Sequence, residues 1–218
     1  MDARTPGLAV TRRWVVDLAT MAAGAVTLVV GGALARGSIS DAETTIFRAL
    51  NDLPPQVFPA IWPLMQYGTF ITIPTLTVIA FAFRRWRLGL ALLIAGVGVY
   101  ALARLAKVVV ERPRPGGLLA DVTSHEAFAR DSLGFPSGHA AVASALTVVA
   151  FAFLPRRWAL VALGVAIVVM LGRMYVGAHL PLDLVGGAAL GAIAGAAANL
   201  LVGVPPRADP SAAHRRPS

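Results

Sequence analysis

Two residues near the end of this chain have the types and spacing of a nucleophile with its orienting acid. His179 and Asp183 are four residues apart, and Pro181 between them marks the expected start of a helix, so both side chains can lie on one side of its first turn. A carboxylate that holds one imidazole nitrogen fixes the tautomer and leaves a basic lone pair on the other nitrogen. The spacing therefore predicts that His179 attacks and that Asp183 orients it.

A second histidine, His139, ends the segment PSGH, which opens an apolar stretch. Ser137 is a favourable N-cap residue there, and the backbone N–H groups that follow it lie at the positive end of a helix. Such a helix start binds anions, and Gly138 allows a ligand to approach the backbone closely. We expect Ser137 and Gly138 to bind phosphate, and His139 to act as the general acid that protonates a leaving oxygen.

Three cations belong to two further polar segments. Lys107 and Arg114 lie in KVVVERPRP, and Arg173 opens RMYVGAHLPLD. The planar fork of arginine suits phosphate oxygens, and phosphoryl transfer needs mainly alignment and neutralisation of charge. The chain has no H-E-x-x-H, paired-carboxylate or Cys/His metal spacing. We therefore expect these cations to bind phosphate in a reaction that uses no metal and no other cofactor.

Each of these residues also has a simpler interpretation. Lys107 and Arg104 have long side chains that can snorkel to a membrane surface, and Arg112 and Arg114 suit a basic patch for anionic lipids. The proline and serine of PSGH, like Asp183, are common at ordinary helix starts. These interpretations explain the residues one at a time, whereas a phosphate pocket explains why they gather in three segments.

In this order and spacing, the three segments resemble the signature of the type 2 phosphatidic acid phosphatase superfamily of integral-membrane lipid phosphatases. That signature reads K-x6-R-P, P-S-G-H and S-R-x5-H-x3-D. The matching residues here are Lys107, Arg114, Pro115, Pro136, Ser137, Gly138, His139, Arg173, His179 and Asp183. One position departs from the pattern, because Gly172 stands where the family has serine, and this puts a hydroxyl contact to phosphate in doubt.

The resemblance covers residues 38–200 in the order of spans and motifs, and it implies a fold, a mechanism and a substrate class. It implies a helical core similar to that of vanadium-dependent haloperoxidases and a phosphohistidine intermediate on His179. It also implies a lipid phosphate as the substrate, such as undecaprenyl pyrophosphate or phosphatidate.

Composition independently indicates a membrane protein. Of 218 residues, 57% are hydrophobic and only 14% are charged, and the mean hydropathy is +0.71. A soluble domain of this size cannot hide that much apolar surface. The chain has no cysteine, which excludes disulfides and cysteine metal sites. The net charge of +8 comes largely from short arginine clusters between apolar runs, a pattern that favours membrane orientation over nucleic-acid binding.

We predict an all-α bundle of six transmembrane helices in a single domain over residues 1–204. About 20 apolar residues cross a bilayer, and the candidate stretches are 14–35, 58–83, 88–110, 139–153 with its flanks, 158–175 and 182–204. The second is the least regular, since three prolines interrupt it. Residues 40–52 mix charged and apolar side chains, which predicts an amphipathic interfacial helix. Residues 205–218 have the composition of a disordered tail.

Arginine clusters mark every second boundary between these stretches. By the positive-inside rule, both termini are then cytoplasmic, and the three polar segments face the other side of a bacterial cell membrane. An alternative for the start is a signal peptide, because TRRWVV precedes an apolar run that ends in ALA. That run is longer than the apolar region of a signal peptide.

Two other functions share such an anion pocket. A vanadate-dependent haloperoxidase uses similar residues, but as a family those proteins are soluble. A transporter or lipid-binding protein can hold anions with intramembrane charges, although no inverted repeat is evident here. We expect the loop 116–135, with His125, Glu126, Arg130 and Asp131, to shape the choice of headgroup.

Overall fold

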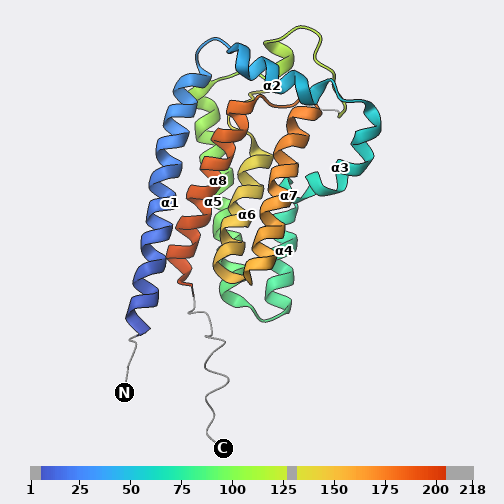
Figure 1. Cartoon of the computed structure of the whole chain (residues 1–218). Helices are drawn as coiled ribbons and strands as arrows, with labels where there is room; N and C mark the ends of the chain where they lie inside the picture. Colours follow the sequence, from blue (N-terminus) through green and yellow to red (C-terminus); the bar gives the residue numbers. More distant parts are fainter. Residues whose placement is uncertain (1–5, 127–131, 205–218) are drawn as a thin grey trace, which may run out of the picture.

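The protein is an all-helical bundle (Figure 1). The computed structural model describes residues 6–126 and 132–204, with side chains from residue 13 onward. The helices are α1 Pro6–Ala35, α2 Asp41–Asn51, α3 Phe58–Met65, α4 Thr72–Ala82, α5 Trp86–Val110, α6 Gly138–Phe153, α7 Arg156–Tyr175 and α8 Pro181–Val202, with 3-10 turns at Pro55–Val57, Gln66–Gly68 and Pro115–Gly117. The predicted fold class is confirmed, whereas the predicted tail 205–218 lies outside the described residues.

Four of these helices, α1, α5, α7 and α8, are long and apolar enough to cross a membrane. The pair α3 and α4 passes the same test only when joined, and it bends by 65°. With 16 residues, α6 is about 24 Å long, which is less than the hydrocarbon thickness of about 30 Å. Length and composition thus support four or five crossings, and the count of six remains a prediction.

The stretch 58–83, predicted as one span interrupted by prolines, forms two helices, α3 and α4, and the break lies at 66–71 instead of at the prolines. The carbonyl oxygen of Gln66 accepts hydrogen bonds from the hydroxyls of Thr69 and Thr72, at 2.7 and 2.6 Å. Such local bonds compete with the helical pattern. Gly68 packs so closely on α6 that a Cβ there would lie 2.8 Å from the His139 carbonyl oxygen. The bend therefore lies against the start of α6.

Three glycines spaced four apart let α8 approach α6 backbone to backbone. An added Cβ would lie 2.4, 2.2 or 2.9 Å from a carbonyl oxygen of α6: Gly187 faces Ser137, Gly191 faces Ala141 and Gly195 faces Ala145. Small residues at a helix interface, glycine above all, let membrane helices come this close. The contact sets the first turn of α6 beside the first turn of α8, so it positions His139 relative to Asp183.

Along its length α1 also packs beside α8 (Figure 1). The Asp17 side chain of α1 is buried, and it accepts two hydrogen bonds from Arg13 at 2.8 Å and one from Asn199 of α8 at 3.2 Å. A buried carboxylate requires partners of this kind. The first helix is therefore part of the packed bundle.

On α2 the side chains of Glu43, Phe47 and Asn51 are buried, and their spacing of four places them on one face. The helix begins at a cap, since the Ser40 hydroxyl accepts a hydrogen bond from the Glu43 N–H at 3.2 Å. The helix predicted over 40–52 is present as α2, and its interfacial position stays a prediction. Its buried face carries an acid.

Among the described residues, the arginine-bearing turns and the polar segments lie at opposite ends of the bundle (Figure 1). The turns that join α4 to α5 and α6 to α7 lie at the end where the described chain starts and stops. At the other end lie α2, the start of α6 and the connection between α7 and α8. The prediction that the three polar segments share one end is confirmed.

Candidate active site

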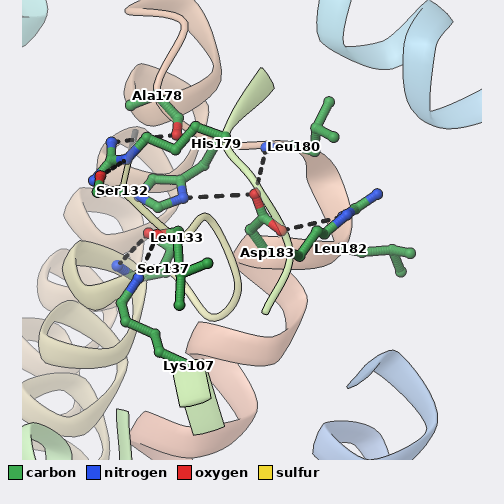
Figure 2. Close-up of polar contacts among 12 residues, drawn as sticks. Lys107, Ser132, Leu133, Ser137, Ala178, His179, Leu180, Leu182 and Asp183 are labelled. Carbon is green, nitrogen blue, oxygen red and sulfur yellow. Dashed lines mark hydrogen bonds and ion pairs between the residues drawn. The ribbon is translucent and has the colours of Figure 1, made fainter. Parts of the chain in front are cut away.

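His179 and Asp183 lie together at the start of α8, as their spacing predicts (Figure 2). His179 Nδ1 is 3.6 Å from Asp183 Oδ2, which is within reach of an ion pair but longer than a hydrogen bond. The same oxygen accepts a hydrogen bond from the Leu180 N–H at 2.9 Å. The other oxygen accepts one from Arg112 Nη1 at 3.1 Å. The Asp183 carboxylate is thereby fixed on both sides.

Burial lowers the pKa of His179 from 6.5 to about 4, although the Asp183 carboxylate raises it. The positive charges of Arg173 and Arg114 lower it further. The imidazole is therefore neutral at pH 7. Because Nδ1 faces the carboxylate, the proton is favoured on Nδ1, which leaves the lone pair on Nε2. This is the protonation state that a nucleophilic histidine needs.

The start of α6 has the form that the segment PSGH predicts. Ser137 is fully buried and caps the helix, its hydroxyl accepting a hydrogen bond from the Ala140 N–H at 3.4 Å. The first N–H groups of a helix have no acceptor within it, and those of Gly138 and His139 precede the capped one. An added Cβ on Gly138 would meet no atom within 4 Å, so the backbone there borders open space.

His139 lies near the other predicted residues, since the charges of Arg173 and Arg114 act on its imidazole. Lys107, at the end of α5, donates a hydrogen bond to the Leu133 carbonyl oxygen at 2.6 Å (Figure 2). It also interacts electrostatically with Arg114 and Asp183. Lys107 therefore reaches toward the site, which the snorkelling interpretation does not explain.

Arg114 is held by the surrounding backbone and a serine. Its Nε donates to the Ser132 hydroxyl at 2.5 Å and its Nη1 to the Ala178 carbonyl oxygen at 3.4 Å. Burial and the nearby charge of Arg173 lower the pKa of Arg114. Two neighbouring guanidinium groups in a partly buried site favour the arrival of an anion.

The side chain of Arg173 is buried, and its Nη1 lies 2.5 Å from Glu126 Oε2. Its buried Nε has no hydrogen-bond partner among the residues described. The Glu126 carboxylate thus lies beside Arg173, a cation that the sequence predicts to bind phosphate.

The structure brings all eight predicted residues to one end of the bundle, where they come from the three polar segments of the chain. The set comprises His139, His179, Asp183, Lys107, Arg114, Ser137, Gly138 and Arg173. Two imidazoles, three cations and a helix start therefore surround one region, which is the composition of a phosphoryl-transfer site.

Comparison with known proteins decides the family. The model of the PAP2 superfamily matches residues 84–204, which is more than half of the chain. The chain belongs to the PAP2 superfamily. The resemblance seen in the sequence is thereby confirmed.

Three known proteins illustrate the similarity. An undecaprenyl-diphosphatase of Sulfolobus acidocaldarius is 30% identical over 129 residues, which are 59% of this chain and 62% of that protein. The chain thus spans less than two thirds of the length of this relative. The crystal structure of Aquifex aeolicus LpxE superimposes with a TM-score of 0.67 and 25% identity, covering 74% of this chain and 98% of that chain.

The crystal structure of a transmembrane PAP2 type phosphatidylglycerolphosphate phosphatase from Bacillus subtilis gives a TM-score of 0.71. It is 23% identical, with 84% of this chain and 95% of that chain covered, and it shows that the fold is shared. The long apolar helices α1, α5, α7 and α8 support an integral membrane protein.

The departure from the PAP2 signature at Gly172 has a packing reason. An added Cβ at this position would lie 2.7 Å from the sulfur of Met65 and 2.9 Å from its Cγ. Met65 belongs to α3, so the space that a serine side chain would need here is filled from the neighbouring helix. The space beside Gly172 is thus occupied by the Met65 side chain.

Sequence reasoning missed Glu43 and Arg112. The interpretation of Arg112 as part of a lipid-binding patch is wrong, because it is 3% exposed and bonds to both Glu43 and Asp183. Burial opposes its charge, but the hydrogen bonds and charges of these two carboxylates outweigh that effect and raise the pKa of Arg112. The only signal for Glu43 was an acid in line with Phe47 and Asn51 on one helix face.

The loop that was expected to shape headgroup choice is held by α2 and α7. Asn51 accepts a hydrogen bond from the Thr123 N–H at 3.0 Å and donates one to its carbonyl oxygen at 2.8 Å. The rings of His125 and Tyr175 stack with centroids 4.3 Å apart. These contacts bring Glu126 to the site. The other two residues named for this loop, Arg130 and Asp131, lie outside the described residues.

Proposed function

We propose that this PAP2 protein is a lipid phosphatase that removes a phosphate or pyrophosphate headgroup without a metal. The observation that carries the proposal is the convergence of two histidines and three cations around the start of α6. The names of the relatives from Sulfolobus acidocaldarius and Bacillus subtilis support a lipid phosphate as substrate. Undecaprenyl pyrophosphate and phosphatidate are the compounds to test first.

In the first step, His179 Nε2 attacks phosphorus while the bond from phosphorus to the leaving oxygen breaks. His139 donates its proton to that oxygen, so the alcohol or lipid monophosphate leaves in protonated form. Lys107, Arg114 and Arg173, with the N–H groups of Gly138 and His139, balance the charge on the transferred group. The product on the protein is a phosphohistidine.

In the second step, water attacks the phosphohistidine and His139 takes one of its protons. The nitrogen–phosphorus bond breaks, inorganic phosphate leaves and His179 regains its lone pair. Asp183 keeps the His179 ring in one orientation through both steps, as a carboxylate does for a catalytic histidine.

Phosphate release from a panel of lipid phosphates in detergent, with EDTA present, tests the proposal. His179→Ala should lower turnover by at least about a thousandfold, the loss typical of a missing nucleophile, and His139→Ala by about 10²- to 10⁴-fold. His214→Ala is the matched control, because that histidine belongs to none of the three segments. Full activity of His179→Ala, or an absolute need for a divalent metal, would reject the mechanism.

Two further measurements separate the other functions that suit an anion pocket. Vanadate should inhibit a phosphatase, whereas halide oxidation after addition of vanadate would indicate a haloperoxidase. Binding of a lipid phosphate without release of phosphate would indicate a binding or transport protein.

We also propose that the site faces the extracytoplasmic side, which the positive-inside rule supports because the arginine-bearing turns lie at the opposite end. The chain has no cysteine, so single cysteines can be labelled without background. Ser124→Cys should react with a membrane-impermeant maleimide in intact cells, and Arg157→Cys only after the cells are opened. The reverse pattern would refute the orientation.

A further inference from the structure

A buried network of three charged side chains lies directly behind the His179–Asp183 pair. Arg112 Nη2 lies 2.7 Å from Glu43 Oε2, and its Nη1 is shared between Glu43 Oε1 at 3.2 Å and Asp183 Oδ1 at 3.1 Å. Glu43 is 6% exposed, Arg112 3% and Asp183 0%. At a site buried from solvent, an arginine side chain held by two carboxylates has little freedom to move.

Glu43 also fixes the backbone at the start of α8. Its Oε1 accepts a hydrogen bond from the Leu182 N–H at 3.1 Å, beside the residue that carries the orienting carboxylate. The first N–H groups of a helix require acceptors from outside it, and here α2 supplies one. Glu43 thus acts on Asp183 twice, once through Arg112 and once through the main chain.

The network reaches the proposed reaction only through Asp183. Asp183 Oδ2 faces His179, and Oδ1 faces Arg112. If Arg112 turned away from Glu43, it would draw the Asp183 carboxylate out of line with the imidazole. A shift of 1 Å in a reacting group can cost about 100-fold in rate.

From these contacts we infer that Glu43 and Arg112 are positioning residues that hold Asp183, and through it His179, in the orientation needed for attack. The inference rests on the proposed function. It also assigns a role in the site to α2, which lies outside the range 84–204 matched by the family model.

Three variants test this inference by different changes to the same contacts. Glu43→Gln removes one charge and leaves Arg112 with Asp183 as a one-to-one pair. Glu43→Asp keeps the charge but shortens the side chain, so it cannot reach both of its partners. Arg112→Lys keeps the charge but loses the fork that bridges two carboxylates. Asp41→Asn is the matched control, an exposed acid in the first turn of the same helix.

Each of the three variants should lower kcat about 10- to 100-fold, as loss of an orienting contact does. The inhibition constant of inorganic phosphate should stay within about twofold, since these residues do not touch the anion. With ¹⁵N-labelled histidine, NMR should show less of the Nδ1–H tautomer of His179 at pH 7. Asp41→Asn should match the wild type in all three measurements.

Unchanged kcat in the folded variants would overturn the inference. A rise in the inhibition constant equal to the fall in kcat would overturn it too, because it indicates general collapse of the site. So would failure of all three to fold, since the network would then serve the fold alone. The proposed function is judged separately: it fails if the wild type releases no phosphate or if His179→Ala remains active.

Discussion

Replacing Glu126 by glutamine should make inorganic phosphate and vanadate bind more tightly. In the structure, Glu126 Oε2 lies 2.5 Å from Nη1 of Arg173, one of the cations proposed to bind phosphate. A bound phosphate must take this guanidinium from the carboxylate, and the two anions repel each other. Glutamine has nearly the same size as glutamate but no charge, so it competes less with the ligand.

The expected size of the effect follows from the burial of the two side chains. A hydrogen bond to a charged group contributes about 1.5 to 3 kcal/mol net. Arg173 is 4% exposed but Glu126 is 29% exposed, and solvent screening reduces the contribution to about 1 to 2 kcal/mol. Since 1.4 kcal/mol corresponds to about tenfold, the inhibition constants should fall about 5- to 30-fold.

The assay is competitive inhibition of lipid-phosphate hydrolysis in detergent, with vanadate and inorganic phosphate as inhibitors. Asp121→Asn is the control, because it removes one exposed negative charge from the same loop. Unchanged or weaker inhibition of Glu126→Gln would refute the idea that this carboxylate competes for Arg173. An equal gain in Asp121→Asn would refute it too, because net charge alone would then explain the result.

Three further variants test the packing and the buried charges. Gly191→Ala would place a Cβ 2.2 Å from the Ala141 carbonyl oxygen, and scanning fluorimetry should show a loss of about 1 to 3 kcal/mol, or roughly 2 to 12 °C in apparent melting temperature. Below pH 6.5 the His179 imidazole is protonated in the unfolded chain, whereas in the folded protein it stays neutral down to about pH 4. The free energy of unfolding therefore falls by up to about 3 kcal/mol on acidification. In His179→Gln the melting temperature should depend less on pH between these values. Asp17→Ala leaves Asn199 without its acidic partner and should cost about 2 kcal/mol, and an unchanged melting temperature would contradict the packing of α1 on α8.

Hydropathy and spacing were enough to predict the helical class, the ends of most helices and the gathering of the site residues. These features depend on local sequence or on a motif, and both are visible in one chain. The break at 66–71 was not predictable, because it results from threonine hydroxyls and from the contact of Gly68 with α6. The role of Arg112 was misinterpreted because its partner Glu43 is 69 residues away, and no local sequence pattern predicts such a pairing.

The spacing of four between the glycines of α8 matches the spacing of the α6 carbonyl oxygens that they face. Because the two surfaces repeat at the same interval, neither helix can slide along the other by a fraction of a turn without a steric clash. The next position that fits lies about 6 Å away, which is four times the helical rise. His139 and Asp183 therefore keep their relative position, and any adjustment of the site to different ligands must take place in segments around this pair, such as α2 and the loop after α5.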